Sequence, residues 1–350
     1  MPERPTLDTV AAAAGVSRMT VSNAYNRPDQ LSEATRERVL SAAAALGYPG
    51  PNPAGRSLRR GETGAVGVLL SEGLAYAFTD PGLVSFMRGV SSELGSSGKA
   101  MLMVPGEADP DGALVRGAIV DAFILCAMAE DDPAVAAVLS RHVPVVTAGS
   151  PRLPGIPFVG IDNRAAGALI AAHLLDLGHT RLGVVMLPSR EPFAGGSRRG
   201  APRLGLRRRL EGFTQAVTDA GLDPSAITVA IATENTRAAG TEAARDLLSS
   251  SNATPPTAIF AVTDVLALGA LSAARLEGRR VPRDVSVVGF DDIVEAGLSS
   301  PPLTTVAQSL FEQGTQAARL ALALMAGQPV RSPRIGAELL VRGSTARPGA

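Results

Sequence analysis

The sequence predicts an all-α helix-turn-helix headpiece joined to an α/β body of two lobes, each built on a doubly wound parallel sheet. Three observations predict this fold: short capped helices at the N-terminus, a linker rich in proline and glycine, and β-branched runs that alternate with amphipathic segments. We expect a headpiece over 1–50, a hinge over 51–62 and a body over 63–350.

The N-terminal segment shows three short helices. The first spans 7–14 and ends at Gly15. Ser17 can cap the second helix, and Ser32 can cap a third that ends at Gly47. A helix, a tight turn containing glycine and a second helix of about two turns form a helix-turn-helix motif.

The body is interpreted as strands alternating with helices. The strands are expected at 65–70, 100–104, 122–125, 143–147, 158–161, 181–187, 227–232, 258–262 and 285–290. Amphipathic helices are expected at 165–177, 206–220 and 265–277. This alternation favours parallel sheets, and so many strands favour two lobes over a single sheet. The segment 190–205, rich in Gly, Arg and Pro, is interpreted as a solvated insertion.

Composition indicates a globular protein, with 45% hydrophobic and 19% charged residues among 350. The formal net charge is zero, but residues 1–60 hold eight arginines and five acidic residues, a net charge of +3. A basic N-terminal unit points mildly to a polyanionic partner, although chance asymmetry over such a short segment also explains it.

Several classes of protein are disfavoured. Cys126 is the one cysteine, which excludes an intramolecular disulfide and a multi-cysteine metal site; its apolar surroundings predict a small buried side chain. The N-terminus lacks a signal-peptide pattern and no apolar run is long enough to span a membrane, so we expect a cytoplasmic protein without membrane contact.

Catalysis is not expected. His142, His173 and His179 are interpreted as structural, and no nucleophile with a nearby histidine, phosphate loop or metal-ligand cluster is recognisable. The adjacent carboxylates of Asp291 and Asp292 at a strand end should point to opposite sides. The sequence therefore predicts no catalytic residues, no metal and no cofactor.

The second helix carries the candidate DNA-reading residues. Arg18, Met19 and Asn23 are its exposed positions, placed to reach base edges in a major groove, whereas Val21 and Ala24 face the core. Hydroxyls and amides near helix starts are candidates for phosphate contacts; these are Thr6, Ser17, Thr20, Ser22, Asn26 and Thr35. The alternative is a small helical interaction domain with a solvated arginine.

Ordered motifs in this segment resemble the lactose-repressor (LacI/GalR) family. They are TLDTVAAAAGVSRMTVS at 6–22, VLSAAAALGY at 39–48 and PNPAGRSL at 51–58. The resemblance implies a hinge that folds into a helix on DNA and wedges Leu58 into the minor groove, with Asn52, Arg56 and Ser57 beside it. Gly55 stands where the family usually has alanine and costs about 1 kcal/mol of helix propensity, so we expect this helix only on DNA.

The resemblance continues through the body. The matching motifs are VGIDN at 159–163, HLLDLGH at 173–179, RLEGF at 209–213, DVLALG at 264–269, VVGFDD at 287–292 and PPLTTV at 301–306. They imply a body similar to periplasmic sugar-binding proteins (type I), with a ligand between two lobes. Three crossovers should then lie near Asp162, near Asp291 and before a last strand at 339–341.

The candidate effector residues follow from this arrangement. Asp162, Asp264 and Asp291 follow predicted strands, where open α/β sheets bind ligands. Arg209 matches the family's ligand-gripping arginine, and Asp80 stands where the family usually has asparagine before proline. Carboxylates and a guanidinium suit a polyhydroxylated, carbohydrate-like effector. Two simpler roles stay open: Asp264 as a helix cap and Asp291-Asp292 as a turn. Tyr76 or Phe78 is expected to supply a stacking face.

The sequence thus predicts a transcriptional regulator that binds a pseudo-palindromic double-stranded DNA operator as a homodimer. We expect it to act as a repressor. A small-molecule effector would shift the equilibrium between lobe arrangements and so change DNA affinity. A solute-binding protein would share the body, and an α/β enzyme could carry a helical domain. The basic headpiece argues against the first, and the absence of a catalytic constellation against the second.

Overall fold

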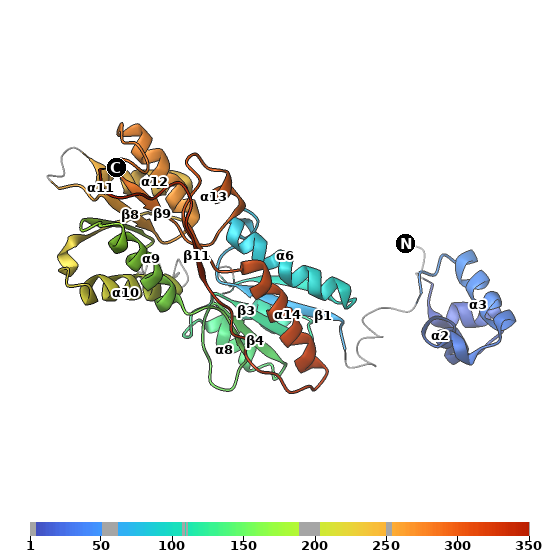
Figure 1. Ribbon diagram of the computed structural model, residues 1–350. Helices are drawn as coiled ribbons and strands as arrows, with labels where there is room; N and C mark the ends of the chain where they lie inside the picture. Colours follow the sequence, from blue (N-terminus) through green and yellow to red (C-terminus); the bar gives the residue numbers. More distant parts are fainter. Residues whose placement is uncertain are drawn as a thin grey trace. The chain divides into compact units, whose positions relative to one another are not determined.

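The computed structural model describes residues 5–50, 62–106, 109, 111–188, 204–249 and 254–349. The chain divides into two compact units, Met1–Gly64 and Ala65–Ala350, and each is described by itself (Figure 1). The fold class expected from the sequence is confirmed: a helical headpiece precedes an α/β body with parallel sheets.

The headpiece is a three-helix unit. Its helices are α1 (Leu7–Ala14), α2 (Arg18–Asn26) and α3 (Glu33–Ala45), with a short 3₁₀ turn η1 (Pro28–Gln30) before α3. The predicted caps are confirmed, because Ser17 accepts from the Thr20 N–H at 3.0 Å and Ser32 from the Thr35 N–H at 3.3 Å. Val10, Val21 and Val39, one from each helix, are fully buried and form the centre of a small core.

The first lobe is built on a five-stranded parallel sheet in the order β2-β1-β3-β4-β5. Its strands are β1 (Ala65–Leu70), β2 (Ala100–Pro105), β3 (Ala122–Cys126), β4 (Val145–Ala148) and β5 (Phe158–Val159). Its helices are α5 (Leu74–Ala77), α6 (Pro81–Ser96), α7 (Ala113–Gly117), α8 (Pro133–Leu139) and, from late in the chain, α14 (Leu310–Met325). Val66 and Val68 belong to the core beneath α6 and α14, whereas Leu69 faces α7 and α8.

The second lobe is built on a four-stranded parallel sheet in the order β7-β6-β8-β9. Its strands are β6 (Leu182–Met186), β7 (Ile227–Ile231), β8 (Ala258–Ala261) and β9 (Ser286–Val288). Its helices are α9 (Asn163–Asp176), α10 (Leu204–Asp219), α11 (Arg237–Leu248), α12 (Asp264–Leu276) and α13 (Val294–Leu298), with a 3₁₀ turn η2 (Pro224–Ala226). Phe213 of α10 stacks on Phe260 of β8 with ring centroids 5.1 Å apart, which ties the helix to the sheet.

Three chain segments join the lobes, at 160–162, 289–309 and 326–337, in agreement with the expected positions. The second carries β10 (Thr305–Ala307) and the third leads directly into β11 (Glu338–Leu340); these two strands pair antiparallel. The last strand, expected at 339–341, is confirmed as β11, although its partner β10 was not foreseen. The expected end of β9 was wrong: the strand ends at Val288, not at residue 290, because the chain leaves the sheet to cross between lobes. Asp291 and Asp292 there have φ of 123° and 57°.

No helix in the described part of the chain is both long and apolar enough to cross a membrane.

Candidate DNA-reading helix and effector cleft

Helix α2 presents polar side chains outward from the headpiece. Met19 is 65% exposed, and Arg18 pairs with Asp8 at 3.7 Å while both side chains stay 68% exposed. So exposed a pair is worth little in water, and the guanidinium can leave Asp8 for another partner. Asn23, one turn further along, is partly exposed. The opposite side of α2 is buried through Val21 and Ala24, as predicted.

The expected phosphate-contacting residues divide into two groups. Thr6 and Ser17 are the N-cap residues of α1 and α2, and Thr35 lies in the first turn of α3. Ser22 is different, because it is only 6% exposed and accepts a hydrogen bond from the Asn26 amide at 3.3 Å. Its burial removes Ser22 from the proposed phosphate contacts.

The hinge residues Asn52, Arg56, Ser57 and Leu58 lie outside the described residues, as does most of the 190–205 insertion.

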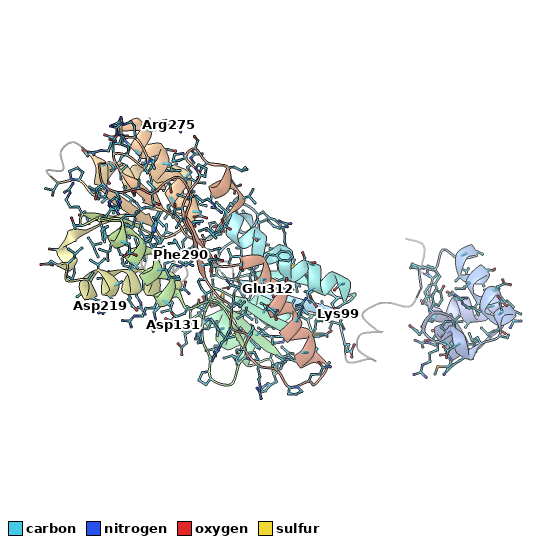
Figure 2. All side chains as sticks on the ribbon, viewed as in Figure 1. Lys99, Asp131, Asp219, Arg275, Phe290 and Glu312 are labelled. Atoms are coloured by element: carbon cyan, nitrogen blue, oxygen red, sulfur yellow. The ribbon has the colours of Figure 1, made fainter. Side chains whose placement is uncertain are left out.

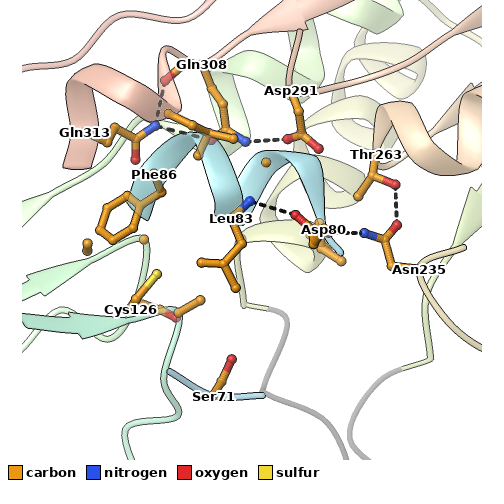
Figure 3. A pocket seen from close by; sticks show the side chains of 18 of the residues that line it. Ser71, Asp80, Leu83, Phe86, Cys126, Asn235, Thr263, Asp291, Gln308 and Gln313 are labelled. Atoms are coloured by element: carbon orange, nitrogen blue, oxygen red, sulfur yellow. Dashed lines mark hydrogen bonds between the residues drawn. The ribbon is translucent and has the colours of Figure 1, made fainter. Parts of the chain in front are cut away.

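A cavity of about 250 Å³ lies between the two lobes of the body (Figure 3). Its polar lining comes from both lobes and from the crossovers. The polar side chains that line it include Tyr76, Asp80, Asn163, Arg209, Asn235, Thr263, Asp291, Gln308 and Gln313. Among the candidate effector residues, Asp80, Arg209 and Asp291 are thus brought together at this cavity.

Arg209 is the most firmly held of these groups. It is 6% exposed; its Nε donates to Asn163 Oδ1 at 2.8 Å and its Nη1 to the Val262 carbonyl at 2.8 Å. The guanidinium carbon also lies 3.5 Å from the centre of the Phe290 ring, a buried residue labelled in Figure 2. These contacts leave Nη2 without a partner among the described residues.

Glycines set the position of Arg209 relative to α9. A Cβ on Gly167 would lie 2.0 Å from the Arg209 carbonyl oxygen, and one on Gly212 would lie 1.9 Å from the carbonyl oxygen of Arg164. Helices α9 and α10 therefore cross in near-contact at two reciprocal glycines. This close approach lets Asn163, at the start of α9, reach the guanidinium.

Asp291 faces Arg209 across the floor of the cavity. Its Oδ1 lies 3.6 Å from Arg209 Nη1 and also accepts from Gln308 Nε2. Burial raises the pKa of Asp291, and the neighbouring guanidinium opposes that shift. Burial disfavours the charged form of Arg209 as well and lowers its pKa to about 10, which leaves the guanidinium charged at neutral pH. The second carboxylate oxygen of Asp291 has no hydrogen-bond partner among the described residues.

Asp80 occupies another wall of the cavity. Its Oδ1 caps α6 by accepting from the Leu83 N–H at 2.7 Å, and its Oδ2 accepts from the Tyr76 hydroxyl at 2.7 Å. Of the two aromatic residues expected to supply a stacking face, Tyr76 lines the cavity; Phe78 does not, and is 71% exposed.

Two sequence-predicted effector residues do not line this cavity. Asp162 is exposed and caps α9, accepting from the N–H groups of Arg164 and Ala165 at 3.0 Å each. Asp264 is fully buried; it accepts from the Thr305 hydroxyl at 2.6 Å and from the Ile293 N–H at 2.9 Å. Nor is Asp264 the cap of α12, which is Thr263. Both aspartates act within the protein framework.

The sequence reasoning missed several cavity residues, namely Asn163, Asn235, Thr263, Gln308 and Gln313. Asn163 and Thr263 directly follow or precede the predicted aspartates Asp162 and Asp264 in the chain. The ends of the strands therefore predicted the position of the cavity correctly, but the neighbouring side chain lines it. Asn235, Gln308 and Gln313 had no comparable local signal.

Cys126 and the histidines have the structural surroundings that were expected. Cys126 is buried and lines the cavity, and burial raises the pKa of its thiol to about 12. His179 is buried between the hydroxyls of Thr257 and Ser286, at 3.0 and 3.1 Å. Within the described residues, no group of three or more His, Cys, Asp or Glu side chains is arranged to hold a metal ion.

An outward-facing reading helix on a helix-turn-helix unit, followed by a two-lobed body whose cavity combines polar and apolar side chains, defines a DNA-binding transcriptional regulator. Two family models match the chain: bacterial regulatory proteins of the lacI family over residues 6–52, and the periplasmic binding protein-like domain over residues 171–345.

Similar proteins agree with this class. The HTH-type transcriptional regulator Rv3575c of Mycobacterium tuberculosis is 40% identical over 99% of this chain and 98% of its own length. The chain belongs to the lacI family of bacterial regulatory proteins.

Solved structures resemble the whole chain. The complex of the transcriptional regulator CelR with cellobiose has a TM-score of 0.67 at 32% identity, covering 97% of this chain and 100% of that one. The lac repressor dimer bound to operator and the anti-inducer ONPF has a TM-score of 0.78 at 25% identity, covering 98% of this chain and 100% of that one.

Proposed function

We propose that this chain is a repressor that binds a pseudo-palindromic operator as a homodimer in the cytoplasm and is controlled by a polyhydroxylated, carbohydrate-class effector. The observation that carries the effector assignment is the pair of the buried Arg209 and the largely buried Asp291 in the cavity lining. Arg209 Nη2 can donate to one hydroxyl oxygen while the second oxygen of Asp291 accepts from the next hydroxyl.

The similar proteins support the same class of ligand. CelR was solved with cellobiose, and the lac repressor with its operator as a dimer. In this chain Asn163 and Gln313 supply further neutral polar groups to the cavity, which suits hydroxyls better than a strongly charged ligand.

The DNA contacts proposed are base reading by Arg18, Met19 and Asn23. Phosphate contacts are proposed for Thr6, Ser17, Thr20, Asn26 and Thr35, with minor-groove contacts from the hinge residues 52–58. The exposure of α2 supports the first group, and the positions of Thr6, Ser17 and Thr35 at helix starts support the second. A dimer would place two such helices on successive half-sites of one operator.

The test is selection of duplexes from a random library by the purified full-length chain, followed by binding at increasing salt. We expect a site with two inverted half-sites and an affinity that falls steeply with salt concentration. Sugars and polyols would then be screened for release of the selected duplex. Failure to enrich any duplex, with or without the sugars present, would reject the regulator.

A solute-binding protein or an enzyme remains disfavoured as the function. The similar proteins carry regulator names over essentially the full chain, and the cavity offers no pairing of a nucleophile with a base among its described residues.

A further inference from the structure

One wall of the effector cavity is a hydrogen-bonded bridge between the lobes. Asn235, in the loop between β7 and α11 of the second lobe, donates to Asp80 Oδ2 at 2.7 Å and to the Tyr76 hydroxyl at 3.1 Å, both in the first lobe. Figure 3 shows the Asp80–Asn235 contact together with the neighbouring contact to Thr263. We refer to Tyr76, Asp80, Asn235 and Thr263 as the interlobe bridge.

The polar groups of the interlobe bridge are hydrogen-bonded to one another. Asp80 already accepts from Leu83, Tyr76 and Asn235, and the Asn235 carbonyl oxygen accepts from the Thr263 hydroxyl at 2.7 Å. Thr263 fixes which end of the Asn235 amide faces Asp80, so the NH₂ group donates and a charged acceptor receives it. The hydrogen-bonding groups of the bridge are therefore satisfied by protein groups.

Other direct hydrogen bonds between the lobes are not found among the described residues, apart from those made by the crossover segments. At this wall Asn235 ties the second lobe to Asp80 and Tyr76 of the first. Asn235 lines a cavity of about 250 Å³, below the range of about 300–1,000 Å³ that drug-sized ligands occupy. The opposite side, at Arg209 and Asp291, keeps free hydrogen-bonding positions for a ligand.

We infer that Asn235 is a specificity-determining residue: it locks the lobes around a site for a single-ring sugar or polyol and excludes disaccharides. The inference rests on the proposed function and narrows it to a size class. A two-ring ligand would need the lobes to separate and the Asn235–Asp80 bond to break, which leaves a partly buried carboxylate with fewer donors. The cellobiose-binding relative would then differ from this chain in ligand size while sharing its fold.

The first test measures the bridge without any ligand. Spin labels at Ala136→Cys on α8 and Ala220→Cys at the end of α10, both exposed positions, report the distance between lobes in a full-length Cys126→Ala chain diluted with unlabelled protein. We expect one narrow distance distribution for the parent. Asn235→Asp places a carboxylate against Asp80 and should give a longer and broader distribution.

The reciprocal exchange provides the control. Asn235→Asp combined with Asp80→Asn restores a donor facing an acceptor, and asparagine can still cap α6. We expect this double variant to return to the parental distribution, which a merely local structural role of Asn235 would not produce. An Asn235→Asp distribution identical to that of the parent would overturn the bridge.

The second test uses ligands and the native Cys126. D-ribose, D-glucose and cyclohexanehexol, and separately cellobiose and maltose, are titrated calorimetrically into the full chain and into Asn235→Ala. We expect a single-ring compound to bind the parent at least ~10-fold more tightly than either disaccharide, and Asn235→Ala to lose most of that preference.

Each other result has a defined meaning. Equal binding of a disaccharide by the parent, or binding of none of the five compounds, would overturn the single-ring assignment. Neither result would contradict the proposed DNA-binding function, because duplex selection alone tests that function.

Discussion

The headpiece and the effector cavity prepare their polar groups for binding in opposite ways. On α2, Arg18 and Met19 extend into solvent from a helix that rests on three buried valines. In the cavity, Arg209 is buried and Asp291 is largely buried; contacts from α9, from Val262 just after β8 and from a crossover segment hold them. Changes at the exposed site should therefore alter binding alone, whereas changes at the buried site should alter stability as well.

The largest effect is expected at Arg209. Arg209→Met leaves the largely buried carboxylate of Asp291 without its cation, so the free energy of unfolding of the body should fall by about 3–5 kcal/mol. Chemical denaturation followed by circular dichroism measures this. Arg207→Met is the matched control, because Arg207 is 66% exposed beside Glu211 and should change stability by less than about 1 kcal/mol. Equal stabilities of the two variants would contradict the contrast between buried and exposed sites.

A pH effect is expected from the buried carboxyl of Asp264. Burial raises its pKa to about 6, against an ordinary value of 3.8 in the unfolded chain. The folded state therefore holds more protons between these values, and stability should fall as the pH rises from about 4 to 6, then level off. The fall should be at most about 3 kcal/mol, at about 1.4 kcal/mol per pKa unit. Subtracting the denaturation profile of Asp264→Asn isolates this slope; identical profiles would exclude Asp264 as its source.

The crossing of α9 and α10 gives an intermediate effect. Gly167→Ala forces a Cβ against the Arg209 carbonyl and should cost about 1–3 kcal/mol while moving the guanidinium. Gly95→Ala on α6 meets no atom within 4 Å and should instead be neutral or stabilising by up to about 1 kcal/mol. Thermal unfolding of both variants tests the pair, and destabilisation by Gly95→Ala of the same size would show that close packing is not the cause.

The smallest effect on stability is expected in the headpiece. Arg18→Ala should weaken binding to the selected duplex by about 1–3 kcal/mol and leave the unfolding of the body unchanged. Asp8→Ala, which removes only the exposed partner of Arg18, is the control and should leave affinity equal or slightly higher. Fluorescence anisotropy with labelled duplex measures both. Loss of body stability in Arg18→Ala would break the proposed separation between the two sites.

The same difference explains what could be predicted from the sequence. The headpiece depends on neighbours in the chain: Ser17 and Ser32 cap helices through residues three positions later, so the helix starts were predicted correctly. The cavity depends on residues far apart, since Asn235 meets Asp80 across 155 positions. Strand ends located the cavity, but Asp162 and Asp264 turned out to cap or support helices and loops. The three-residue strand β10 is too short to give a recognisable pattern, and β11 was expected only from the family resemblance.

The tyrosine content of the chain allows the interlobe bridge to be followed by spectroscopy. The protein has no tryptophan and three tyrosines, of which Tyr25 and Tyr48 belong to the headpiece and Tyr76 to the body. Its phenol donates to a carboxylate, and burial beside Asp80 raises the pKa of Tyr76 well above its ordinary value. The tyrosine absorbance and fluorescence of a 286-residue body, Ala65–Ala350, therefore have one residue as their source, and that tyrosine lies where the lobes meet. The regulator thus carries a natural chromophore within the interlobe bridge.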